Sequence, residues 1–218
     1  MYVETSYIKS LIQQGEHQQL DFKFEIADSR KIARTLVAFA NTDGGKLLVG
    51  VKDNGSIAGV RSDEEYYMVE AAANMYCKPE LPVEMKRWTV DGKSVLEVTV
   101  DRKEDGPYLA QTKDGRWRAY VRSKDQTLLA NTVLYKVLKN KQQQSGVLVE
   151  YTKNEKLLLN YLEENQWITQ SRFCKIADVS WKHAEKILVN LLSLQIIELV
   201  FAENRVYYQL SEKEHDFC

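Results

Sequence analysis

Hydrophobic and polar positions change their period several times along the first part of the chain. Residues 20–25 alternate apolar and charged side chains, which predicts a strand with one buried face. Residues 32–40 place their apolar side chains on one face of a helix, and residues 47–51 form a continuous apolar run that is typical of a buried strand. Further helices are predicted at 7–14, 63–76 and 128–138, and further strands at 57–60, 83–89, 95–100 and 116–121. Helices interspersed with hairpins favour the α+β class over a regular βαβ series.

The last third of the chain shows a different order of elements. Apolar periodicity predicts helices at 154–162, 170–177 and 181–194, followed by strands at 196–201 and 205–210. Three helices followed by a hairpin is the order of a winged helix, which is an elaborated helix-turn-helix. A polar stretch, Lys139–Gly146, separates this part from the first and ends in Ser-Gly. We therefore predict two domains, an α+β domain at 1–144 and a winged-helix domain at 145–218.

The composition describes a folded protein without a membrane anchor. Hydrophobic residues make up 44% and charged residues 28%, which excludes a disordered chain. No apolar run approaches the ~18 residues of a transmembrane helix, and the first residues lack the pattern of a secretory signal. The three cysteines lie far apart, which fits a reducing cytoplasm better than a disulfide scaffold. We expect a cytoplasmic protein.

The charge balance limits any nucleic-acid site to a local patch. Lys and Arg number 30 and Asp and Glu number 31, so the net charge is −1. A nucleic-acid-binding domain is usually basic where it touches phosphates. The strongest local patch is the predicted strand at 116–124, where alternation places on one face Arg116, Arg118, Tyr120, Arg122 and Lys124. This face is either a phosphate-binding row with one stacking aromatic ring, or a solvated face that offsets nearby acidic residues.

The predicted helix at 181–194 is the candidate recognition helix. It carries Lys182, Lys186 and Asn190, which are side chains that reach phosphates or read base edges. Several acidic residues of the same domain would repel DNA, namely Glu163, Glu164, Asp178 and Glu185. The alternative is a structural or dimerising winged helix.

Three carboxylates form a second candidate site. Glu16, Asp21 and Asp53 are either ordinary surface and turn residues, or ligands that hold Mg²⁺ or Mn²⁺ over a scissile phosphate. A phosphate-binding loop for ATP is not supported, because Gly45-Lys46 is followed by leucine and lacks the required earlier glycine. The sequence therefore gives no basis for ATP as a cofactor.

Three segments together resemble a known family. The segments are Glu16–Lys23, Ala38–Gly45 with Gly50–Gly55, and Pro107-Tyr108 with Tyr120–Arg122 and Thr127. In order and spacing they resemble the Schlafen-type AlbA-like domain over roughly residues 10–130. The resemblance implies a nucleic-acid-binding α+β domain, for which a winged-helix tail is a common companion in bacterial members.

The resemblance also implies a possible catalytic triad. A related domain of animal Schlafens is a metal-dependent endoribonuclease with three acidic residues, which correspond by motif position to Glu16, Asp21 and Asp53. Asp21 stands where glutamate is usual, and the zinc site of the animal relatives has no counterpart among the cysteines here. Animal enzymes pair two such lobes, so a comparable cleft in this chain requires a dimer.

We expect a nucleic-acid-binding protein rather than an enzyme, specifically a dimeric DNA-binding transcriptional regulator. The first alternative is a metal-dependent ribonuclease that uses the acidic triad with Mg²⁺ or Mn²⁺. The second is a dimerising protein-interaction module. Both DNA and RNA stay open as partners, because no residue identifies a reader of the 2′-hydroxyl.

Overall fold

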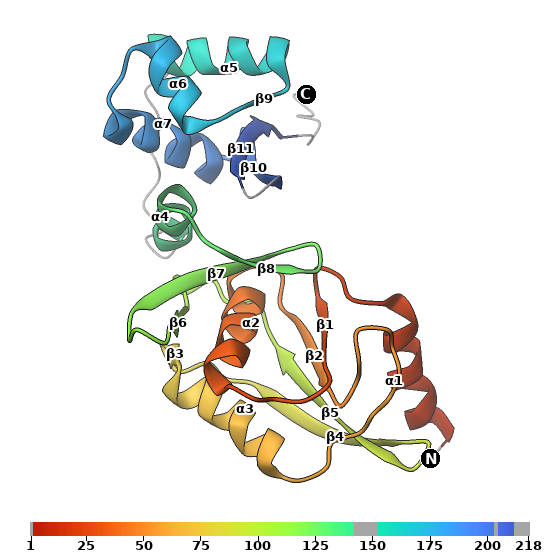
Figure 1. Cartoon of the computed structure of the whole chain (residues 1–218). Coiled ribbons are helices and arrows are strands. Elements are labelled where there is room, and N and C mark those ends of the chain that lie inside the picture. The colour runs from red at the N-terminus through yellow and green to blue at the C-terminus, as the bar shows by residue number, and fades with distance from the viewer. Residues whose placement is uncertain (1, 142–151, 203–204, 212–218) are drawn as a thin grey trace. The chain divides into compact units, whose positions relative to one another are not determined.

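The computed structural model describes residues 2–141, 152–202 and 205–211. The chain divides into two compact units, Met1–Ala130 and Asn131–Cys218, which are called unit 1 and unit 2 below (Figure 1). Among the described residues, no helix is both long and apolar enough to span a bilayer.

Unit 1 combines helices with two four-stranded sheets. The first sheet has the order β1-β2-β5-β4, in which β1 and β2 are parallel and the other neighbours are antiparallel. The second has the order β3-β6-β7-β8 and is antiparallel throughout. The predicted α+β class is confirmed. The elements are α1 (Tyr2–Gln14), β1 (Leu20–Lys23), α2 (Ser29–Asn41), β2 (Gly45–Val49), α3 (Glu64–Met75), β3 (Cys77–Lys78), β4 (Glu84–Val90), β5 (Lys93–Val100), β6 (Leu109–Gln111), β7 (Trp117–Ser123) and β8 (Gln126–Leu129).

Helix α2 is the central element of unit 1. Asp28 caps its start, where the carboxylate Oδ1 accepts a 2.9 Å hydrogen bond from the backbone N–H of Arg30. The apolar stripe predicted from the sequence is buried, and α2 packs against α3 and the strands β6 and β7 (Figure 1). Leu36 and Phe39 of α2 share one hydrophobic core with Leu47 of β2. The position of α2 therefore decides which faces of the neighbouring strands are covered.

The turn from α2 into β2 requires two glycines. Gly44 has a φ of +70°, and a Cβ there would lie 2.8 Å from the carbonyl oxygen of Val100. A Cβ on Gly45 would lie 2.4 Å from the ring of Phe39. Backbone and side chain approach too closely for any larger residue. This part of the family signature thus serves the fold.

The described residues of unit 2 form four helices and a small antiparallel sheet of order β10-β11-β9. Thr152 and Glu155 form a capping box at the start of α5, and Ser180 caps α7. The helices and strands enclose a second hydrophobic core that includes Phe173, Leu188 and Tyr208. The elements are α4 (Thr132–Lys141), α5 (Lys153–Asn165), β9 (Trp167–Ile168), α6 (Gln170–Ala177), α7 (Trp181–Ser193), β10 (Ile197–Ala202) and β11 (Arg205–Leu210).

The division between the units falls earlier than the boundary expected at 144/145. Helix α4, which the sequence assigned to the first domain, belongs to unit 2. Its apolar residues Val133 and Val137 are buried in the core of unit 2, where α4 packs against α7. Most of the predicted linker lies outside the described residues. The part of that stretch that is described, residues 139–141, belongs to α4.

Candidate functional site

Helix α7 presents a polar, basic face to solvent. Lys182, Lys186 and Asn190 are spaced four residues apart, so they lie on one side of the helix. Both lysines are exposed, and Asn190 is half-buried. The opposite face holds Ala184 and Leu188, which are completely buried in the core of unit 2. The expected division of this helix into a core face and a basic face is present in the structure.

One of the acidic residues that we expected to repel DNA is not exposed on this face. Glu185 is 6% exposed and forms an ion pair with Lys136 of α4. Its negative charge is therefore turned inward and offset, which corrects the expectation that Glu185 repels DNA. Asp178, which lies in the turn between α6 and α7, and both Glu163 and Glu164 of α5 are exposed as expected.

A pocket of about 290 Å³ borders the start of α7. The residues that line it include Trp181, Arg205 and, at the start of α6, Thr169 and Ser171. Trp181 is 56% exposed, which is unusual for so large an apolar side chain. A pocket that is lined by both an aromatic and a cationic residue suits a nucleotide, which offers both a flat base and a phosphate.

The continuous cationic row expected on β7 does not form. Burial does not alternate along the strand as predicted, because residues 119–122 are all buried and α2 covers part of the face that carries the row. Tyr120 is 8% exposed and Arg122 is 4% exposed, so neither is available to a ligand on the surface. Arg116, Arg118 and Lys124 are exposed, and Arg116 is paired with Asp114 in the turn that precedes β7.

Arg122 instead connects elements inside unit 1. Its Nη1 lies 3.2 Å from both Asp21 Oδ1 and Thr127 Oγ1, and its Nη2 donates to the carbonyl oxygen of His17 at 3.0 Å. The guanidinium also lies 5.1 Å from the centroid of the Phe39 ring. These contacts assign Arg122 to the fold rather than to a surface site.

The three predicted acidic residues lie close enough to influence one another electrostatically. Burial raises the pKa of Glu16, a hydrogen bond from the backbone N–H of Phe22 lowers it, and the charges of Asp21 and Asp53 raise it. The net result is a pKa above its ordinary value. The 2.8 Å hydrogen bond from Phe22 fixes the carboxylate Oε1 of Glu16 beside β1.

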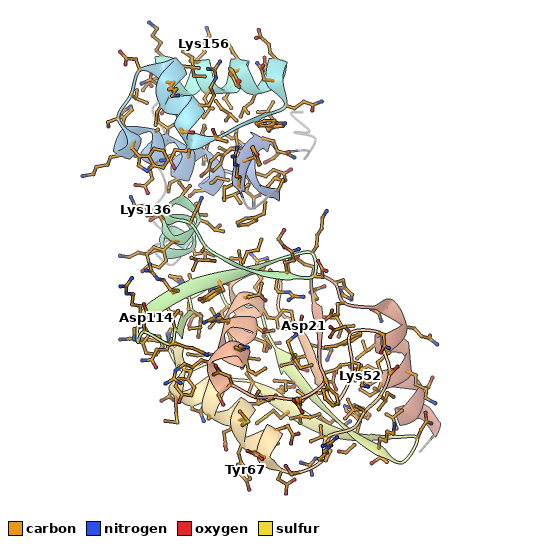
Figure 2. The ribbon with its side chains drawn as sticks, viewed as in Figure 1. Asp21, Lys52, Tyr67, Asp114, Lys136 and Lys156 are labelled. Atoms are coloured by element: carbon orange, nitrogen blue, oxygen red, sulfur yellow. The ribbon has the colours of Figure 1, made fainter. Side chains whose placement is uncertain are left out.

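The acidic residues do not fit a divalent metal ion as they are placed. Asp21 is buried on β1 (Figure 2), and its Oδ1 and Oδ2 contact Arg122 and, at 2.6 Å, Lys23. Two cations thus occupy the carboxylate that a metal would need. Among residues 2–141, 152–202 and 205–211, no three His, Cys, Asp or Glu side chains are grouped so that they could hold a metal ion. The geometry gives no support for Mg²⁺ or Mn²⁺ at Glu16, Asp21 and Asp53.

Sequence reasoning missed a buried polar cluster around Glu97 of β5. The carboxylate of Glu97 accepts three hydrogen bonds of 2.7 Å, from Tyr7, Lys46 and Trp88. Burial would raise the pKa of Glu97, but these hydrogen bonds and the Lys46 charge lower it below its ordinary value. The available signal was one charged residue within the apolar run Val95–Val100.

The fold and its motifs place this chain in a known family. Residues 16–131 match the family model described as Schlafen, AlbA_2. The match covers more than half of the chain, and the chain therefore belongs to the Schlafen, AlbA_2 family. Among curated proteins, none matches the chain significantly.

Two solved structures are similar to part of the chain. The DIP2311 protein from Corynebacterium diphtheriae has 23% identity and a TM-score of 0.44, over 59% of this chain and 28% of that protein. The N-terminal domain of a RecG-related protein from Nitrosomonas europaea has 23% identity and a TM-score of 0.36, over 51% of this chain and 80% of that domain. The chain thus spans less than a third of the DIP2311 protein.

Proposed function

We propose that this chain is a nucleic-acid-binding protein in which unit 2 is a winged helix and α7 is its recognition helix. The observation that carries the proposal is the basic face of α7. Lys182 and Lys186 are exposed there and the half-buried Asn190 lies on the same side, while Glu185 is buried and paired with Lys136. A helix with such a face suits the major groove, in which lysine contacts phosphate or guanine and asparagine contacts adenine.

Two further observations support the proposal. The order α5, β9, α6, α7, β10, β11 with a three-stranded sheet supports a winged helix, in which the β10–β11 hairpin would be the wing. Membership of the Schlafen, AlbA_2 family supports a nucleic-acid-related role. In its specific form, the proposal is a dimeric transcriptional regulator, since two recognition helices related by symmetry would read two half-sites of duplex DNA.

A ribonuclease is the weaker candidate. Its catalytic residues would be Glu16, Asp21 and Asp53, but Asp21 is held by Arg122 and Lys23. A metal ion would have to compete with both cations for the same carboxylate. Cleavage of RNA is therefore only an outcome that the binding experiments would detect.

The role of α7 is tested by the double variant Lys182→Gln/Lys186→Gln in duplex DNA binding at several salt concentrations. We expect affinity at low salt to fall about tenfold or more, and the slope of log K against log salt to become shallower by about 1.8, because two phosphate contacts are lost. The matched control is Lys139→Gln/Lys156→Gln, which removes the same charge from exposed positions of α4 and α5. Equal affinities and slopes for the two double variants would contradict the role of α7.

A further inference from the structure

Two arginines on α2 are stacked on tyrosine rings in unit 1. Arg30 and Arg34 are one helical turn apart, so they lie on the same side of α2. The guanidinium carbon of Arg30 lies 4.5 Å from the ring centroid of Tyr76, and that of Arg34 lies 5.7 Å from the ring centroid of Tyr120. Stacking fixes the plane of a guanidinium and so prepares its N–H groups for a two-point contact with the oxygens of an anion.

Within the described part of the chain, these two guanidinium groups have no hydrogen-bond acceptor. The Nε atoms of Arg30 and Arg34 are buried and unpartnered, and no described carboxylate forms an ion pair with either residue. The Nε of Arg122 is also buried and unpartnered, but Arg122 differs from both because its Nη groups reach Asp21 and backbone carbonyls. The other N–H groups of these two half-buried side chains have no acceptor among the described residues, so they are free to take one from a ligand.

A third arginine lies on β7, on the face of the strand that also carries Tyr120. Arg118 is two residues from Tyr120 on β7, so its side chain leaves the strand on the side where Tyr120 meets Arg34. Arg118 is exposed and, among the described residues, has no ion-pair partner. The acidic residues closest in sequence to Arg30 and Arg118 are already engaged, since Asp28 pairs with Lys113 at 3.8 Å and Asp114 pairs with Arg116 at 3.1 Å (Asp114 is labelled in Figure 2). This face of α2 and β7 therefore carries uncompensated positive charge.

We propose that Arg30, Arg34 and Arg118 bind the sugar–phosphate backbone of a nucleic-acid strand. The inference rests on the proposed function and adds a second contact, on unit 1, that is separate from α7. A guanidinium matches phosphate oxygens in a two-point geometry that lysine lacks. One helical turn separates Arg30 and Arg34 by about 5.4–6 Å, so the two groups are within reach of neighbouring phosphates of one strand.

The test uses the full chain and a labelled single strand of about 20 nucleotides, as DNA and as RNA of the same sequence. Fluorescence anisotropy measures affinity between about 50 and 200 mM salt, the range over which phosphate contacts dominate the change. For Arg30→Gln/Arg34→Gln we expect about tenfold weaker binding at low salt and a salt slope shallower by about 1.4. The matched control is Lys31→Gln, an exposed residue of the same helix, which should bind as the wild type does.

Two additional variants keep the test decisive. Arg118→Gln changes an exposed side chain, so it should fold normally and still bind several-fold more weakly. Arg30→Lys/Arg34→Lys keeps the charge and should fall between the wild type and the glutamine variant, because two-point contacts are lost. DNA and RNA should be affected alike, since both carry phosphates, and an effect on one of them alone would contradict backbone binding.

The outcomes separate this inference from the proposed function. If the wild type binds no nucleic acid at low salt, the proposed function fails and this inference fails with it. If the wild type binds, but the Arg30→Gln/Arg34→Gln and Arg118→Gln variants match Lys31→Gln in affinity and slope, the inference fails while the role of α7 stands.

Discussion

Two arginines on one strand face show how burial decides the role of a residue. Arg118 and Arg122 are four residues apart on β7 and both lie on the face that alternation predicted. Arg118 is exposed, whereas Arg122 lies beneath α2 and its side chain is 1% exposed. The sequence indicates which residues share a face, but it does not show where a helix from elsewhere in the chain covers that face.

Replacement of Arg122 by alanine should destabilise the protein rather than weaken a surface contact. The change removes the guanidinium from buried Asp21, which keeps Lys23 as its remaining partner. Breaking a buried ion pair costs about 3 kcal/mol, so we expect a decrease of that size in the free energy of unfolding, measured by urea denaturation. Arg118→Ala is the control, with an expected change within about 0.5 kcal/mol. Similar stabilities for the two variants would refute the structural role of Arg122.

The segment that joins α2 to β2 shows that a family signature can serve the fold. Asn41, at the end of α2, donates to the carbonyl oxygens of Tyr108 and Tyr120, each at 2.9 Å. Its Oδ1 accepts a 2.8 Å hydrogen bond from the backbone N–H of Tyr108. One side chain thereby satisfies three backbone groups on β7 and on the segment before β6. This explains why the motif combines asparagine with the two glycines of the following turn.

Loss of the Asn41 side chain should therefore be costly. In Asn41→Ala, three backbone groups near a buried side chain lose their partner, at about 1 kcal/mol or more each, so we expect about 3 kcal/mol less stability. Asn54→Ala is a suitable comparison, because Asn54 is exposed and its Oδ1 accepts a single hydrogen bond within its own turn, from Ser56. Thermal and urea unfolding of both variants would measure the difference, and equal losses would show that Asn41 is not the link described here.

The hydrophobic periodicity predicted the helices and strands better than it predicted the unit to which each of them belongs. The amphipathic helices α2 and α7 lie close to where the apolar pattern placed them, because their stripes face the cores of their own units. Helix α4 was also predicted, but its residues Val133 and Val137 are buried in the core of unit 2 and not in the domain to which the sequence assigned the helix. The identity of the core that buries a helix depends on contacts that are distant in sequence.

At the scale of the whole molecule, the sequence identified the family and the class of fold, and both are confirmed. The candidate site was predictable where local spacing defines it, as on the face of α7. The sequence did not predict the contacts that depend on packing between distant segments. These are the buried ion pair of Arg122 with Asp21 and the stacking of Arg30 and Arg34 on tyrosine rings. Dimer formation stays a prediction, as does the regulation of transcription.

The central claim is that the protein binds nucleic acid without cleaving it. The most direct test is a titration of the purified full chain with labelled duplex DNA, single-stranded DNA and structured RNA, at low and moderate salt, with Mn²⁺ and with EDTA. The account predicts binding that weakens steeply with salt, is unaffected by EDTA and leaves every substrate intact. Absence of binding at low salt, or loss of RNA that requires Mn²⁺ and disappears in Asp53→Ala, would contradict it.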